Sequence, residues 1–139
     1  MLEQIFEFIG NHYVLVSVFT FLLVAFIINE GKQGGAAITP GNLVQLVNRE
    51  GAVIVDLREK KDFGAGHIAG AVNIPFGAID SRKGELEAFK EKPVVLVCKM
   101  GQSAGAAGRK LRTDGFEDVR RLSGGMTEWN ASNLPVVKK

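Results

Sequence analysis

The pattern of apolar residues divides the chain into one unbroken N-terminal run and a longer part in which apolar and polar stretches alternate. The run from Tyr13 to Ile28, YVLVSVFTFLLVAFII, holds 16 residues and no charged side chain. At about 1.5 Å per residue this run is short for a bilayer, but a helix that starts at Phe8 reaches roughly 31 Å, which is enough to span one. We therefore predict one transmembrane helix within residues 1–29.

Two other interpretations of this run stay open. A secretory signal peptide could be cleaved near the small residues 35–37 (GAA), but its start is normally basic, and this one carries Glu3 and Glu7. A buried core helix is hard to cover on every side in so small a domain. All 17 Lys and Arg residues lie from Lys32 onward. The positive-inside rule therefore predicts a single-pass protein of the inner (plasma) membrane, with its N-terminus outside and its domain in the cytoplasm.

The rest of the chain alternates short apolar runs with helical patterns. Residues 30–37 (EGKQGGAA) are polar and Gly-rich and predict a flexible linker, which leaves 38–139 for one folded domain. Strands are predicted at 53–56, 72–74, 94–97 and 119–122, and helices are predicted to start at Pro40, Glu85, Ala104 and Met126. This alternation is typical of an α/β fold in which helices cover a mostly parallel sheet and ligands bind at the carboxyl ends of the strands.

Composition and charge narrow the possible functions. The net charge of +2 comes from scattered residues, which predicts an ordinary solvated surface rather than a nucleic-acid-binding face. The single cysteine, Cys98, cannot form an internal disulfide and favours a reducing compartment. His67 has no second His or Cys nearby at metal-ligand spacing, and the Gly-rich stretches do not fit nucleotide-binding loops, so neither a metal nor a cofactor is predicted.

Cys98 follows the most apolar predicted strand and precedes a predicted helix. The loop between them reads KMGQS, and Gly101 allows the backbone to turn tightly there. The N–H groups of such a loop and of the first helical turn favour an anion, and Lys99 adds a positive charge. Cys98 is thus a candidate nucleophile inside a cradle for oxyanions. The alternative is an inert, buried thiol at the end of a strand.

Three ordered motifs resemble the rhodanese domain. Residues 56–76 (DLREKKDFGAGHIAGAVNIPF) resemble its front signature, the segment VVLVCKMGQS resembles its active-site loop, and residues 115–136 (GFEDVRRLSGGMTEWNASNLPV) are similar to its closing pattern. The resemblance covers roughly residues 38–136. It implies a rhodanese-like fold, a five-stranded parallel sheet flanked by helices. One such domain behind an N-terminal span is similar to bacterial single-span rhodanese-like proteins.

The resemblance also implies sulfur transfer. Cys98 would be the catalytic residue, taking sulfane sulfur from thiosulfate or another persulfide donor and passing it to a thiol or cyanide. The substrate-binding residues implied by the matching loop and strand end are Lys99, Met100, Gly101, Gln102, Ser103, Ala104 and Arg58. Arg58 beside Asp56 could instead form an internal ion pair.

The loop departs from the family pattern C-R-x-G-x-R-S at three places. Lys99 takes the first basic position, and Ser103 and Ala104 replace the second Arg and the hydroxyl residue after it. The loop therefore lacks one bidentate anion clamp, so thiosulfate is expected to bind weakly. A second hypothesis follows, in which the domain is a non-catalytic module that recruits a partner, such as another membrane protein, at the lipid bilayer.

Overall fold

The computed structural model describes residues 1–33 and 35–138. By contacts the chain divides into two units, residues 1–32 and the residues from Gln33 onward, and each is described by itself. The second unit contains a five-stranded sheet with all strands parallel, in the order β1-β5-β4-β2-β3. The strands are β1 (Ala36–Ile38), β2 (Val53–Asp56), β3 (Val72–Asn73), β4 (Val94–Val97) and β5 (Val119–Leu122).

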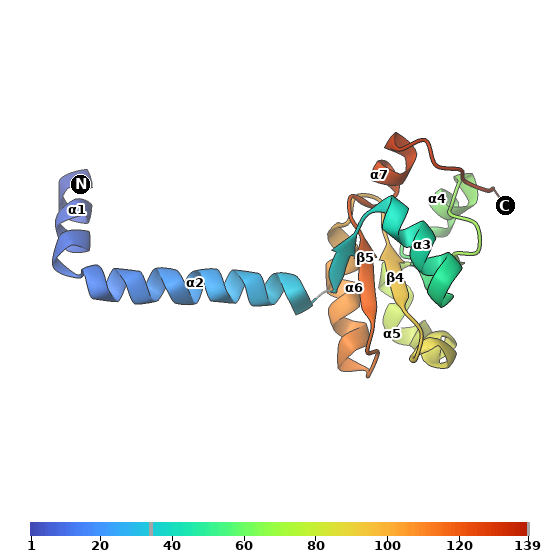
Figure 1. The fold of residues 1–139 in the computed structure, drawn as a ribbon, viewed down its shortest axis with the longest axis horizontal. Helices are drawn as coiled ribbons and strands as arrows, with labels where there is room; N and C mark the ends of the chain where they lie inside the picture. The colour runs from blue at the N-terminus through green and yellow to red at the C-terminus, as the bar shows by residue number, and fades with distance from the viewer. Residues whose placement is uncertain (34, 139) are drawn as a thin grey trace. The chain divides into compact units, whose positions relative to one another are not determined.

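Helices cover both faces of this sheet (Figure 1). One face packs against α5 (Ile79–Arg82), the 3₁₀ helix η2 (Lys83–Phe89) and α6 (Gln102–Thr113), and the other packs against α3 (Pro40–Glu50) and α7 (Gly125–Ala131). Two further short elements, α4 (Lys60–Ala65) and the 3₁₀ helix η1 (Phe76–Ala78), flank β3 in the chain. The two apolar clusters on the faces contain every residue of β4, all four of which are fully buried. The expected α/β fold with a five-stranded parallel sheet is therefore confirmed.

Local chemistry explains the helix that opens this unit. Thr39 caps α3 by accepting a hydrogen bond from the Asn42 N–H at 3.2 Å, and Pro40 occupies the first helical position. The helix ends at Gly51, whose φ of +65° suits glycine. Leu43 and Leu46 of its inner face are buried against the sheet.

The predicted linker is where the structure differs from the expectation in this unit. The sequence predicts a flexible linker that includes residues 36 and 37, but they lie in β1, which pairs with β5 through Ala36↔Arg120 and Ile38↔Leu122. A three-residue strand with two alanines has no apolar alternation of its own, so its conformation depends on the edge that β5 offers. Gly35 is needed beside it, because a Cβ there would collide with the Val119 carbonyl oxygen.

The first unit consists of α1 (Leu2–Asn11) and α2 (Tyr13–Gln33). The prediction of one continuous helix from Phe8 to Ile28 is wrong, because α1 ends at Asn11 and the next residue, His12, has a φ of −126° and a ψ of 39°. Gly10, Asn11 and His12 are weak helix formers in sequence, which explains a break at this point. Over the described residues no single helix is long and apolar enough to cross a membrane, although α1 and residues 13–29 of α2 together meet that standard across a 95° bend.

Candidate active site

Cys98 lies directly after β4, the central strand of the sheet, at its carboxyl end. Its side chain is buried, with 5% exposure, and packs in the apolar cluster that β4 shares with α6. The sulfur nevertheless has a polar contact, because the backbone N–H of Gly101 donates a hydrogen bond to Cys98 Sγ at 2.9 Å. The thiol therefore combines an apolar surrounding on one side with a backbone donor on the other.

The turn of the loop depends on Gly101. This residue has a φ of +95°, a left-handed conformation that favours glycine, and it caps α6. Because of this cap, α6 begins at Gln102, two residues earlier than the predicted start at Ala104. The N–H groups of Gln102, Ser103 and Ala104 form the first helical turn, where no intrahelical acceptor exists. Within the described chain these three N–H groups have no other acceptor.

The first residues of α7 bind backbone carbonyl groups of the loop. The Met126 N–H donates to the Cys98 carbonyl at 2.8 Å, and the N–H and Oγ1 of Thr127 donate to the Lys99 carbonyl at 3.0 and 2.9 Å. This approach requires glycine at position 125, since a Cβ there would collide with the Cys98 carbonyl oxygen. The Cys98 and Lys99 carbonyls are thus bound to α7. The N–H groups of the loop face other directions.

Arg58 follows β2, the strand next to β4, and forms an internal ion pair. Its Nε and Nη2 donate to the carboxylate of Asp56 at 3.0 and 2.8 Å, its backbone N–H donates to the same carboxylate, and Nη2 also donates to the Gly66 carbonyl at 2.8 Å. Asp56 is almost fully buried, at 1% exposure, and Asn73 braces the segment by donating to the Asp56 and Arg58 carbonyls. The expected alternative, an internal pair, is therefore present, and it offsets most of the Arg58 charge.

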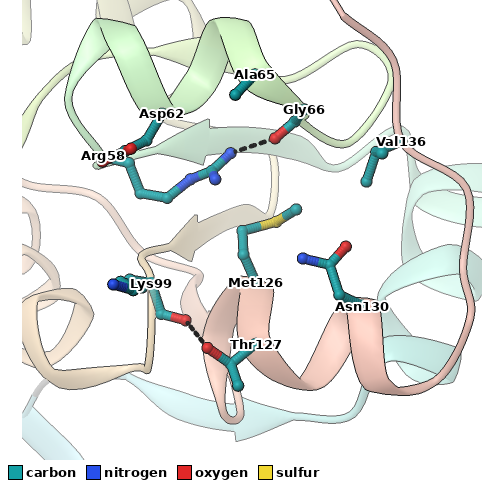
Figure 2. A pocket seen from close by; sticks show the side chains of 9 residues that line it. All are labelled: Arg58, Asp62, Ala65, Gly66, Lys99, Met126, Thr127, Asn130 and Val136. Atoms are coloured by element: carbon teal, nitrogen blue, oxygen red, sulfur yellow. Dashed lines mark hydrogen bonds between the residues drawn. The ribbon is translucent and has the colours of Figure 1, made fainter.

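Two cavities flank the loop. One, of about 300 Å³, is lined by Arg58 and Lys99 together with α4, α7 and the C-terminal tail, and Figure 2 shows its side chains. The other, of about 480 Å³, is lined by Met100, Gly101 and Gln102 together with Arg109 and Arg121. Cys98, Ser103 and Ala104 line neither of these two cavities.

The structure thus separates the residues that the sequence analysis grouped as one site. Lys99 and Met100 are exposed, Met100 to 60%, whereas Ala104 is fully buried and contributes only its backbone to the loop. Lys99 and Arg58 face one cavity, and Met100, Gly101 and Gln102 face the other. The backbone around Cys98 and the basic side chains therefore occupy neighbouring but different places.

Sequence reasoning missed Met126 and Thr127. They lie 28 residues downstream of Cys98 and Lys99, respectively, and nothing in their local pattern indicates a contact with the loop. The one local signal near them is the pair Gly124-Gly125, because two adjacent glycines favour a tight turn before a helix. Both glycines do have positive φ, 72° and 57°.

Comparison with known proteins identifies relatives of this domain. The family model for a rhodanese-like domain matches residues 39–132. The uncharacterized protein YibN of Escherichia coli is 37% identical, with 99% of both chains covered. The thiosulfate sulfurtransferase GlpE of Pseudomonas putida is 36% identical, with 68% of this chain and 84% of that relative covered. A solved rhodanese-related protein from Thermoplasma volcanium has a TM-score of 0.68 and 25% identity, and covers 75% of this chain and 99% of its own.

Proposed function

The chain belongs to the rhodanese-like family, and from this premise we propose that it is a sulfurtransferase in which Cys98 carries sulfane sulfur as a persulfide. The single observation that supports this most is the placement of Cys98 Sγ, which accepts the Gly101 N–H next to the unbonded N–H groups of the first turn of α6. Donors that are fixed in place before the reaction stabilise a developing anion without reorganisation. One relative in the family, GlpE of Pseudomonas putida, is named a thiosulfate sulfurtransferase.

The reaction divides into two displacements. The Cys98 thiolate attacks the outer sulfur of thiosulfate, the S–S bond of thiosulfate breaks, and sulfite leaves with the bonding pair. The product is a Cys98 persulfide, whose negative charge the loop N–H groups stabilise. An acceptor thiolate or cyanide then attacks the outer sulfur of this persulfide and releases the Cys98 thiolate. This is covalent catalysis with two half-reactions.

The donor is thiosulfate or another persulfide. Ser103 and the fully buried Ala104 leave the first turn of α6 without a guanidinium that could clamp sulfonate oxygens. Lys99 supplies an exposed positive charge within the loop, but as a point charge rather than a bidentate clamp. We therefore expect weak binding of thiosulfate, and tighter binding is expected for a donor that makes contacts beyond the loop.

Intact-mass measurement of the full chain tests this function. The protein is incubated with thiosulfate, or with a persulfide donor, and freed of small molecules. We expect a gain of one sulfur atom, which Cys98→Ser abolishes and which cyanide removes. If neither donor adds sulfur to the wild-type chain, Cys98 is not a sulfur carrier.

A second function is favoured by the loop departures. Without the clamp, and with Met100 60% exposed at the loop, the domain could serve as a module that binds a partner protein. In that case Cys98→Ser leaves partner binding intact and the sulfur experiment fails. A positive result in the sulfur experiment decides against this module as the sole function.

We also propose that residues 1–29 anchor the domain to the inner membrane, with the N-terminus outside and the domain in the cytoplasm. The support is compositional: the run from Tyr13 to Ile28 carries no charge, and its side chains, apart from that of Val16, are exposed. Deletion of residues 1–32 should move the protein from an alkali-washed membrane fraction to the supernatant. Recovery of the full chain in the supernatant would contradict the anchor.

A further inference from the structure

Helix α1 differs from α2 in how its apolar side chains are arranged. In α1 they recur at the i, i+3, i+4 and i+7 positions of one side. This apolar face consists of Leu2, Ile5, Phe6 and Ile9, with Phe8 at its edge, and the polar face opposite consists of Glu3, Gln4, Glu7 and Asn11. The first 16 residues of α2, by contrast, are uncharged and mostly apolar on every side. A one-sided helix is typical of the boundary between lipid and water, whereas a helix that is apolar all round is typical of the lipid interior.

No described part of the chain covers the apolar face of α1. None of the residues of α1 is buried, and its apolar side chains on and beside this face are between 41% and 71% exposed. The side chains of residues 13–29 in α2 are exposed as well, apart from that of Val16. The uncovered apolar surface therefore continues from one helix to the next, and a single apolar phase that surrounds α2 would also cover the apolar face of α1.

The junction between the two helices fixes their mutual direction. His12 alone separates the end of α1 at Asn11 from the start of α2 at Tyr13. Hydrogen bonds continue on both sides of it, because the His12 N–H donates to the Phe8 carbonyl and the Val16 N–H donates to the His12 carbonyl, both at 2.9 Å. The rings of Phe8 and His12 also pack, with their centres 4.7 Å apart. The two helix axes differ by 95°, so α1 lies parallel to the surface of any bilayer that α2 enters along its normal.

We propose that α1 is an interfacial helix, which lies along the outer surface of the membrane with its apolar face in the lipid and its polar face in water, while α2 enters the bilayer. The uncharged part of α2 is near the lower limit of about 17 residues for a span. Helix α1, about 15 Å long, then covers the acyl chains around the outer end of this short span. The inference rests on the proposed membrane anchor and goes beyond it, because anchoring alone requires only α2.

The charges of α1 indicate which force holds it at the surface. Its polar face carries Glu3 and Glu7, and residues 1–29 contain no Lys or Arg. Interfacial helices with basic polar faces are attracted to anionic lipids, and α1 lacks this attraction. Burial of the apolar face is then the main favourable contribution, and the covalent link to α2 keeps α1 at a high local concentration beside the surface. We therefore expect the position of α1 to be insensitive to salt.

Spin-label accessibility in the full chain tests the position of α1. Cys98→Ser removes the only cysteine, and single cysteines at positions 3 to 9 are labelled with a nitroxide in nanodiscs of phosphatidylethanolamine and phosphatidylglycerol. Oxygen concentrates in lipid, whereas a nickel chelate stays in water. We expect the ratio of the two collision rates to oscillate with a period of about 3.6 residues. Lipid contact is expected at positions 5, 6 and 9, and water contact at 3, 4 and 7, at low and at high salt.

Three results would overturn the inference. Lipid contact at every position would make α1 part of the embedded span, and water contact at every position would place it away from the membrane. A fall of both collision rates on the apolar face, with spin–spin broadening that disappears on dilution with unlabelled chain, would show that a second copy covers this face. A label at Leu22, in the middle of α2, identifies failure of the anchor itself. Water contact at Leu22 contradicts the anchor and the inference together, whereas lipid contact there with any of the three results overturns the inference alone.

A matched pair of substitutions shows which face holds α1 at the surface. Phe6→Glu and Gln4→Glu each add one negative charge to α1, the first on the apolar face and the second on the polar face. Neither residue is buried, so the packing of the domain does not depend on them. With the label at Ile9→Cys, we expect Phe6→Glu to raise the collision rate with the nickel chelate several-fold, because a carboxylate is unfavourable in lipid. Gln4→Glu should leave this rate unchanged, and equal effects of the two substitutions would overturn the inference.

Discussion

Strands β2 and β4 lie side by side and end at the same edge of the sheet, but the polar groups at their two ends differ in their hydrogen-bond partners. After β2, the Asp56 carboxylate, the Arg58 guanidinium and the Asn73 amide bind one another or neighbouring carbonyls. After β4, the carbonyls of Cys98 and Lys99 are bound by α7, while the first N–H groups of α6 have no acceptor within the described chain. At the end of β2 the polar groups therefore satisfy one another, whereas at the end of β4 N–H donors are left without an acceptor in the described chain, and the proposed function uses them to bind an anion.

The geometry of the peptide unit explains why the contact with α7 leaves the N–H groups of the loop unpaired. The C=O and N–H of a trans peptide point in opposite directions. When α7 binds the carbonyls of Cys98 and Lys99, it turns the N–H groups of Lys99 and Met100 away from α7. The α7 contact therefore orients the loop without using its donors.

The largest expected effect comes from breaking the ion pair between Asp56 and Arg58 at the end of β2. Asp56→Ala leaves Arg58, whose side chain is 12% exposed, without its carboxylate. We expect the free energy of unfolding to fall by about 3 kcal/mol, because a mostly buried charge loses its partner. Chemical denaturation measures this change. As a control, Asp118→Ala breaks a pair whose side chains are 41% and 34% exposed and should cost less than about 1 kcal/mol. Equal losses in the two variants would show that burial does not distinguish the pairs.

The next largest effect comes from displacing the loop that follows β4. Gly125→Ala places a methyl group against the Cys98 carbonyl at a residue whose φ is +57°. The loop must shift, and a misplacement of about 1 Å typically lowers a rate about a hundredfold. We expect persulfide formation from thiosulfate to slow by that order. Gly77→Ala, where a Cβ meets no atom within 4 Å, serves as the control, and a similar rate in the two variants would contradict the role of α7.

A smaller change sharpens the same comparison. Thr127→Val removes the Oγ1 hydrogen bond to the Lys99 carbonyl and keeps the backbone one. The loss of one such bond, about 1 kcal/mol, predicts a several-fold slower persulfide formation. The rate is measured with thiosulfate and without an acceptor, so that only persulfide formation is followed. Thr127→Ser should restore most of the rate, and a rate in the valine variant equal to that of the wild type would show that the backbone bond alone holds the loop.

The smallest effect belongs to the solvent-exposed ion pair Arg82–Glu85, which sets the lower limit of the comparison. The hydrogen bond from Arg82 lowers the pKa of Glu85, and the same contact raises the pKa of Arg82. Because the folded-state pKa of Glu85 is depressed, its contribution to stability is present above the unfolded-state pKa and is lost as the pH falls through the folded-state pKa. Glu85→Gln should therefore be slightly less stable than the wild type at neutral pH, with a difference that shrinks in acid. A difference that grows in acid would reverse this assignment.

The sequence by itself determined the central part of the fold. The apolar, β-branched runs that became β2 and β4 cannot be exposed, and the Thr-Pro and Gly signals around α3 specify local backbone geometry. The position of Cys98 at a strand end, before a glycine turn, followed from the same local pattern. These features depend on residues that are close in the chain, which is why a pattern can predict them.

Only the tertiary structure decided β1, the contact of α7 with the loop and the cavity beside it. Ala36 and Ala37 become a strand because β5 offers them a partner, and the Met126 and Thr127 donors meet loop carbonyls 28 residues away. The cavity brings Asp62, Asn130 and Val136 together from three separate segments. Contacts of this kind depend on how the helices pack on the sheet, and packing is a property of the whole domain rather than of any local stretch.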